Sequence, residues 1–191
     1  MQIRTLRTVA ALTTIMVVVD ALFLPALLAA AWGGADWYLD NFIATNRVMI
    51  GFKVATMIVF ALWIYVAGRT LAAAGYGDCE FSPGSRIWWF LVPIANFYMP
   101  FKGMRELWNA SHGVEDYQAN APLVTSWWAA YLLVLLSSWA VLLMTDASGA
   151  GALIAIPFLL VRAVLAILMI HRITGALSAG PRSGRLEEVF A

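Results

Sequence analysis

Three charged residues lie inside stretches of the chain that are otherwise almost wholly apolar: Asp20, Lys53 and Arg162. A charge in the middle of a bilayer costs at least ~2.5–3.5 kcal/mol, so such residues usually face the interior of a helix bundle and pair with one another. At 1.5 Å per helical residue, Asp20 and Arg162 lie ~18 and ~12 Å from the same membrane face. We therefore predict that Asp20 faces Arg162, with Lys53 as a possible third member.

This charged layer has two interpretations. A buried pair of Asp20 and Arg162 would fix the register of the helices that carry them. If Lys53 joins, the layer becomes a net positive site that could hold an anionic lipid or a transported ion.

A second group of candidate residues lies in one apolar segment, residues 86–111. Its apolar part, residues 86–100, is too short to cross a bilayer, which takes about 20 apolar residues, and it is interrupted by two prolines. From Phe101 onward the spacing predicts an amphipathic helix suited to a membrane surface. The apolar face would carry Phe101, Met104 and Trp108, and the polar face Lys102, Arg105, Glu106 and Asn109.

The segment could be a cover over the ends of the helices, or it could hold a lipid headgroup or a partner peptide. In the second interpretation Asn96, Arg105 and Glu106 supply the polar contacts. The candidate residues of this segment are Trp89, Pro93, Asn96, Pro100, Arg105, Glu106 and Trp108.

Other chemistry is sparse. The two histidines, His112 and His171, are not placed to ligate a haem between helices, and His112 beside Glu115 and Asp116 is a weak metal signal. The single cysteine, Cys79, has no partner for a disulfide. We expect no catalytic residue, cofactor or metal, and the formal net charge of +1 argues against a nucleic-acid surface.

The elements that must position these residues are helices in a membrane. The 191 residues are 62% hydrophobic and 12% charged, far from the composition of a soluble protein. Four stretches are long enough to span, and helices suit them because all their backbone groups pair internally. We expect an all-α integral membrane bundle in one domain, residues 1–174, with spans at about 8–32, 47–74, 123–144 and 151–170 and a flexible cytoplasmic tail, 175–191.

The distribution of basic residues predicts the orientation. With both termini in the cytoplasm, and with Lys53 and Arg162 within the spans left out, nine basic residues lie inside and only Arg47 lies outside, as the positive-inside rule requires. If residues 87–101 crossed as a fifth helix, most of the later basic residues would move outside. The segment is therefore predicted to stay on the cytoplasmic side, re-entrant or interfacial.

Residues 81–128 also resemble a known family. The pattern FSPG, WWFLVPIAN and PFKGMRELW, followed by the Trp127-Trp128 pair, is similar to the bacterial membrane family called domain of unknown function 4328. The resemblance implies a four-helix fold and a bacterial inner membrane, and it implies no activity.

Three functions from different classes are consistent with the sequence. The first is a non-enzymatic scaffold or accessory subunit that binds a protein partner, or a second copy of itself, through the cytoplasmic segment. The second is a lipid- or ion-binding or transport protein that uses Asp20, Lys53 and Arg162. The third is a lipid-acting membrane enzyme with His112, Glu115 or Glu106 as acid or base.

Overall fold

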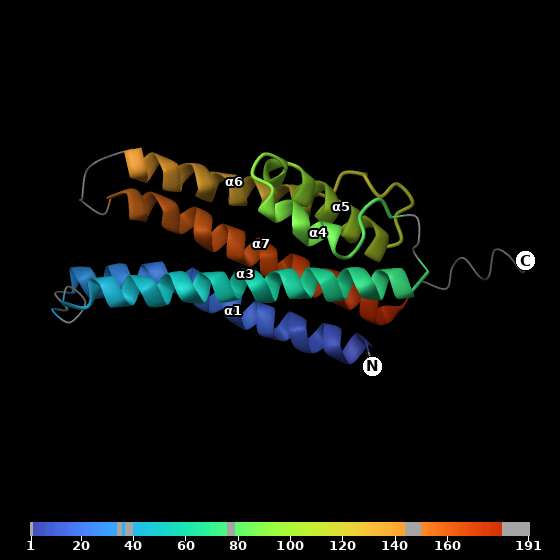
Figure 1. Cartoon of the computed structure of the whole chain (residues 1–191), viewed down its shortest axis with the longest axis horizontal. Coiled ribbons are helices and arrows are strands. Elements are labelled where there is room, and N and C mark those ends of the chain that lie inside the picture. Colours follow the sequence, from blue (N-terminus) through green and yellow to red (C-terminus); the bar gives the residue numbers. More distant parts are fainter. Residues whose placement is uncertain (1, 34–35, 37–39, 76–78, 144–149, 181–191) are drawn as a thin grey trace, which may run out of the picture.

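Every regular element of the protein is a helix in the computed structural model, which describes residues 2–33, 36, 40–75, 79–143 and 150–180. The four long helices run side by side (Figure 1). Helix α1 packs against α3, α6 packs against α7, and contacts between α1 and α7 join the two pairs. Their bounds are α1, Gln2–Trp32; α3, Phe42–Ala73; α6, Pro122–Leu143; and α7, Ala150–Ala179.

Three of these helices, α1, α3 and α7, are long and apolar enough to cross a membrane. Helix α6 is a further apolar helix of 22 residues. Many large apolar side chains on these helices are exposed; examples are Ile15, Ile43, Met57, Ile58 and Leu136, each 60% exposed or more. Water would penalise such a surface, whereas lipid tails solvate it. The fold is therefore that of a helical membrane protein.

Hydroxyl groups within the apolar helices bond to the backbone of their own helix. Thr13, Thr56 and Thr70 each donate to the carbonyl oxygen four residues earlier, at 2.7, 3.0 and 2.8 Å. A buried polar contact also links two helices, because Trp63 Nε1 on α3 donates to Thr174 Oγ1 on α7 at 3.2 Å. Pairing of this kind removes the cost of polar groups in a lipid environment.

The well-packed core lies at one end of the bundle. Its fully buried members include Leu6 on α1, Trp63 and Leu71 on α3, and Met169 and Ile173 on α7. The start of α1 and the end of α7 meet at this end, where Arg7 Nε donates to Ser178 Oγ at 3.2 Å.

The segment between α3 and α6 packs onto the same end of the bundle (Figure 1). It forms a hairpin of short helices: α4, Ser85–Trp88; η1, Trp89–Leu91; η2, Ala95–Phe97; and α5, Met99–Ser111. Pro100 stands in the first turn of α5, where a proline removes no helical hydrogen bond. The α5 helix contacts α3, α6 and α7.

The helix ends differ from the predicted spans in one informative way. The sequence predicts a flexible tail from residue 175, whereas α7 continues through Ala179. Leu177 is buried against the core, so packing keeps this last turn helical despite Gly175. The end comes at Gly180, whose φ of +78° is the left-handed conformation that favours glycine after a helix. The rest of the predicted tail, residues 181–191, lies outside the described residues.

Candidate functional site

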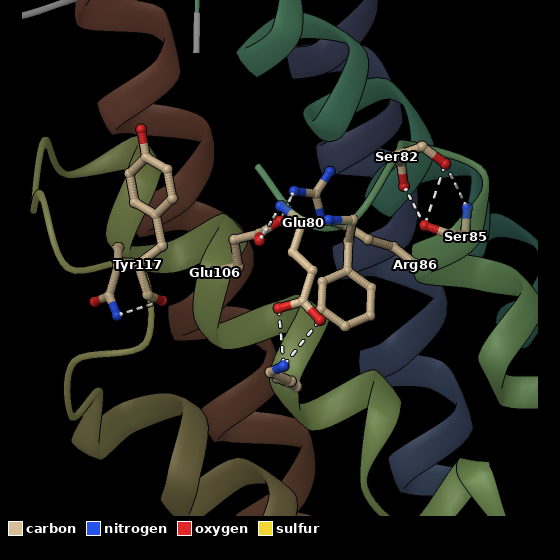
Figure 2. Close-up of polar contacts among 9 residues, drawn as sticks. Glu80, Ser82, Ser85, Arg86, Glu106 and Tyr117 are labelled. Atoms are coloured by element: carbon tan, nitrogen blue, oxygen red, sulfur yellow. Dashed lines mark hydrogen bonds and ion pairs between the residues drawn. The ribbon is translucent and has the colours of Figure 1, made fainter. Parts of the chain in front are cut away.

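A buried ion pair fixes the hairpin between α3 and α6. The Glu106 carboxylate on α5 accepts from Arg86 Nη2 at 2.5 Å and from the peptide N–H groups of Glu80 and Phe81 at 2.7 and 3.1 Å (Figure 2). The Arg86 and Glu106 side chains are only 2% and 1% exposed. Breaking such a pair is costly because the remaining charge has no solvent to stabilise it.

Two glycines make room for this pair. A Cβ atom at Gly68 on α3 would lie 2.9 Å from Arg86 Nη1 and 3.3 Å from Pro83 Cα. A Cβ atom at Gly103 on α5 would lie 3.4 Å from Arg86 Cγ. The absence of these side chains lets α3, α5 and the loop before α4 enclose the guanidinium.

Weaker contacts extend this network on the exposed side. Lys102 Nζ lies 2.8 Å from Glu80 Oε2, and the Lys102 and Glu80 side chains are 24% and 55% exposed. Ser82 and Ser85 bond to each other in the turn before α4 (Figure 2).

The loop after α5 is held in the same manner. Asn109, which is buried, donates through Nδ2 to the carbonyl oxygens of Tyr117 and Ala119 at 3.0 and 2.9 Å. The Arg105 guanidinium donates to Gln118 Oε1 at 3.1 and 2.8 Å. We call residues 79–121 the cap, because they form one folded unit on this end of the bundle.

The hairpin turns at an apolar edge, which we call the tip, residues 88–98. Five of its large side chains are exposed: Trp88 62%, Leu91 69%, Ile94 88%, Phe97 55% and Tyr98 56%. Trp128 Nε1 on α6 donates to the Phe97 carbonyl oxygen at 3.3 Å, which holds the tip against α6.

The charged layer brings together the three residues that the sequence singled out. Lys53 Nζ lies 3.3 Å from Asp20 Oδ1, and Arg162 Nη2 lies 3.6 Å from Asp20 Oδ2. The expected pairing of Asp20 with Arg162 is therefore present, with Lys53 as the third member. The Asp20 side chain is 7% exposed, against 45% for Lys53 and 26% for Arg162. One carboxylate thus faces two cations that remain partly open.

The expected polar face of α5 is wrong for two of its residues. Glu106 and Asn109 are buried rather than exposed, because both bond to loops that fold back onto α5. Asn96, Arg105 and Glu106 do not converge either: within the described residues no hydrogen bond or ion pair joins them. Arg105 bonds to Gln118 and lies over the Phe101 ring, 5.0 Å from its centroid.

The other candidate residues take different positions in the cap. Trp89 and Asn96 are half-buried, Pro93 is exposed and Pro100 is buried. Asn96 Oδ1 is a buried oxygen without a hydrogen-bond partner. Trp108 is half-buried and stacks on His112 with ring centroids 4.2 Å apart.

His112 makes local contacts. Its Nδ1 atom lies 2.8 Å from the Trp108 carbonyl oxygen and 3.1 Å from Ser111 Oγ. Among the described residues, no three His, Cys, Asp or Glu side chains gather as a metal ion would need.

Sequence reasoning missed Arg86 and Gly68 as members of a site. Arg86 is one of the nine basic residues that the sequence assigns to the cytoplasmic side, and its partner Glu106 follows 20 residues later. A signal was present in the sequence, since Arg86 directly precedes the apolar run that enters the hairpin and such a charge needs a partner.

The exposed apolar helices, the internally paired hydroxyls and the charged layer define a helical membrane protein. Within that class, the family model described as Domain of unknown function (DUF4328) matches residues 26–175. The chain belongs to this family, as its resemblance in residues 81–128 indicated. No curated protein and no solved structure matches the chain.

Proposed function

We propose that the protein is a non-enzymatic scaffold or accessory subunit of the bacterial cytoplasmic membrane, which binds a protein partner through its cap. The fixed conformation of the cap carries the proposal. Buried Glu106 and Asn109 hold the loops on either side of α5 in place. A preformed surface loses little conformational entropy on binding, which favours association.

The same bonds weigh against an enzyme. The carboxylate of Glu106 is occupied by Arg86 and two peptide N–H groups, so it is not placed to accept a proton from a substrate. His112 directs Nδ1 to the backbone of its own helix. The lipid-acting alternative thus loses Glu106, the buried one of the three groups that the sequence suggested for it.

Four membrane crossings, with both termini in the cytoplasm and the cap on the cytoplasmic side of the membrane, complete the proposal. The basic residues support this orientation: Arg7, Arg69 and Arg172 all lie on the segments that meet at the cap end. The four crossings would be α1, α3, α6 and α7, because each contains about 20 apolar residues.

Contacts along α3 support a re-entrant tip. Arg86 approaches α3 at Gly68. The tip is bonded to Trp128, and the neighbouring Trp127 stacks on Phe60 of α3 with ring centroids 5.9 Å apart. Phe60 precedes Gly68 by eight residues, or ~12 Å of helix. If the Arg86–Glu106 pair lies at the membrane surface, the exposed tip lies ~12 Å deeper, among lipid tails.

Photo-crosslinking in living cells tests the scaffold. A photoreactive residue replaces Ile94 in the tip or Val114 in the loop after α5, and the matched control replaces Leu168, which is exposed on α7. We expect a discrete protein adduct from a cap position and none from Leu168. An adduct with the mass of two copies would identify the partner as a second chain. Absence of any protein adduct at both cap positions would overturn the proposal.

The charged layer supports a second candidate function, a lipid- or ion-binding or transport protein. Lys53 and Arg162 share Asp20, and both cations are partly exposed within apolar helices. Such a layer attracts an anion. Replacing Lys53 by Met should then abolish anion flux or anionic-lipid retention in reconstituted vesicles, while crosslinking at the cap is unchanged. Unaltered flux and retention in this variant would exclude the second function.

A further inference from the structure

A surface pocket opens at the cap end of the bundle, away from the charged layer. Its volume is about 540 Å³, and it lies between the start of α1, the last turns of α3 and the loop before α4. Gln2, Tyr65 and Arg69 supply its polar groups, and Ala72, Ala73 and Pro83 supply apolar walls. Small alanine side chains on α3 keep the pocket open.

Arg69 is the cation of this pocket, and no described residue accepts a hydrogen bond from its guanidinium. Arg86 and Arg105 both donate to side-chain oxygens, but Arg69 makes no hydrogen bond or ion pair to any other described residue. The Arg69 guanidinium carbon lies 6.0 Å from the centroid of the Tyr65 ring, one helical turn away. A guanidinium offers five N–H donors in a fork that matches phosphate oxygens.

The first turn of α1 adds to the positive potential. Gln2 begins α1 and lines the pocket, so the positive end of a 31-residue helix lies at its rim. The first N–H groups of a helix lack helical acceptors and favour anions.

The pocket also lies at a suitable depth. Arg69 follows Lys53 by 16 residues on α3, or ~24 Å along the helix. With the charged layer inside the hydrocarbon, which is ~30 Å thick, Arg69 stands near the membrane surface on the cap side. Tyr65, 37% exposed and one turn deeper, has the position of an aromatic residue at the lipid–water boundary.

We propose that this pocket binds the phosphate of an anionic phospholipid headgroup. Arg69 and the first turn of α1 hold the phosphate oxygens, and Gln2 donates to the headgroup. The Tyr65 ring lies against the glycerol backbone and the start of the acyl chains. The site depends on the cap end meeting the membrane surface, and it does not depend on partner binding.

Lipid retention measures the site directly. The full chain is reconstituted in nanodiscs of phosphatidylcholine with a minority of phosphatidylglycerol, and native mass spectrometry gives the fraction that keeps one phosphatidylglycerol. Arg69→Gln removes the guanidinium fork, and a lost charged hydrogen bond weakens binding by about tenfold or more. Arg172→Gln is the matched control, because Arg172 is an exposed cation on α7 that does not line the pocket.

We expect the retention of phosphatidylglycerol to fall by about tenfold or more in Arg69→Gln and to stay at the wild-type level in Arg172→Gln. Ala72→Leu, which keeps every charge but fills the pocket, should lose the lipid as well. Equal retention in wild type and Arg69→Gln would overturn the proposal. Equal loss in Arg172→Gln would also overturn it, because that result indicates general attraction between charges.

Inorganic phosphate identifies the source of the phosphate group. A bound phospholipid is retained when phosphate is added, because its acyl chains also contribute to binding. Displacement of the lipid from wild type by inorganic phosphate would show that the pocket takes soluble phosphates instead, and would overturn the assignment to a lipid.

Discussion

Removal of the Glu106 carboxylate should unfold the cap before the rest of the bundle. In Glu106→Ala, the Arg86 guanidinium stays 2% exposed without its counter-ion, and the N–H groups of Glu80 and Phe81 lose their acceptor. Loss of one partner of a buried pair costs about 3–5 kcal/mol. At the middle of that range, the open form of the cap becomes roughly a thousand times more populated.

Cys79 provides the assay for this opening. It is the single cysteine of the chain, it is half-buried, and it directly precedes Glu80, whose peptide N–H bonds to Glu106. The rate at which a maleimide labels Cys79 in detergent micelles therefore reports how often the loop opens. We expect labelling to accelerate by two orders of magnitude or more in Glu106→Ala.

Two further variants separate the buried pair from general loosening. Lys102→Gln breaks an exposed ion pair on the same hairpin, which is worth at most about 1 kcal/mol, so its labelling rate should stay near that of wild type. Arg86→Met combined with Glu106→Gln removes both charges and keeps an acceptor for one of the two N–H groups, which bond to different oxygens of Glu106. This double variant should recover part of the protection. If Glu106→Ala labels no faster than Lys102→Gln, or if the double variant is as open as the single one, the reasoning is refuted.

Three other predictions follow from close contacts elsewhere. Gly68→Ala should lower the free energy of unfolding by about 1–3 kcal/mol, because its Cβ atom meets Arg86 and Pro83. Gly51→Ala should raise the free energy of unfolding by about 0.5–1 kcal/mol, because nothing lies within 4 Å of its Cβ atom, and similar melting temperatures for the two variants would contradict this. Asn109→Ala should lower the free energy of unfolding by about 1–3 kcal/mol and expose the loop after α5 to protease, because two carbonyl oxygens lose their donor. A loop that stays uncut in this variant would count against the prediction. Arg162→Ala should lower the melting temperature, and Asp20→Asn with Arg162→Gln should melt above the worse single variant; failure to do so removes support for the pairing.

The sequence predicted the charged layer because its chemistry leaves few alternatives. Asp20 in an apolar helix needs a cation, and Arg162 and Lys53 lie at compatible depths in other helices. The helices themselves were equally accessible to prediction, since about 20 apolar residues in a row require a membrane. Their ends were harder to place, because the burial of Leu177 extends α7 beyond Gly175.

The cap was harder to predict for a physical reason. Helical periodicity assigns polar residues to the solvent face, and Glu106 and Asn109 obey that pattern in the sequence. Their actual partners are a loop before α4 and a loop after α5, and no local spacing reveals that these loops fold back. Tertiary contact thus reversed the face that the local pattern indicated.

The charged layer also sets an order in which the protein can be made. Asp20 is synthesised first, and Lys53 follows 33 residues later, so these two opposite charges can enter the membrane together as a pair on the α1–α3 hairpin. Arg162 arrives with α7, the last helix, after the cap and α6. Its charge has only Asp20 as an ion-pair partner among the described residues. Because α7 is made last, it docks onto the α1–α3 hairpin that is already in the membrane. A chain that stops before α7 would insert stably, but it would lack the helix that joins the α1–α3 pair to α6.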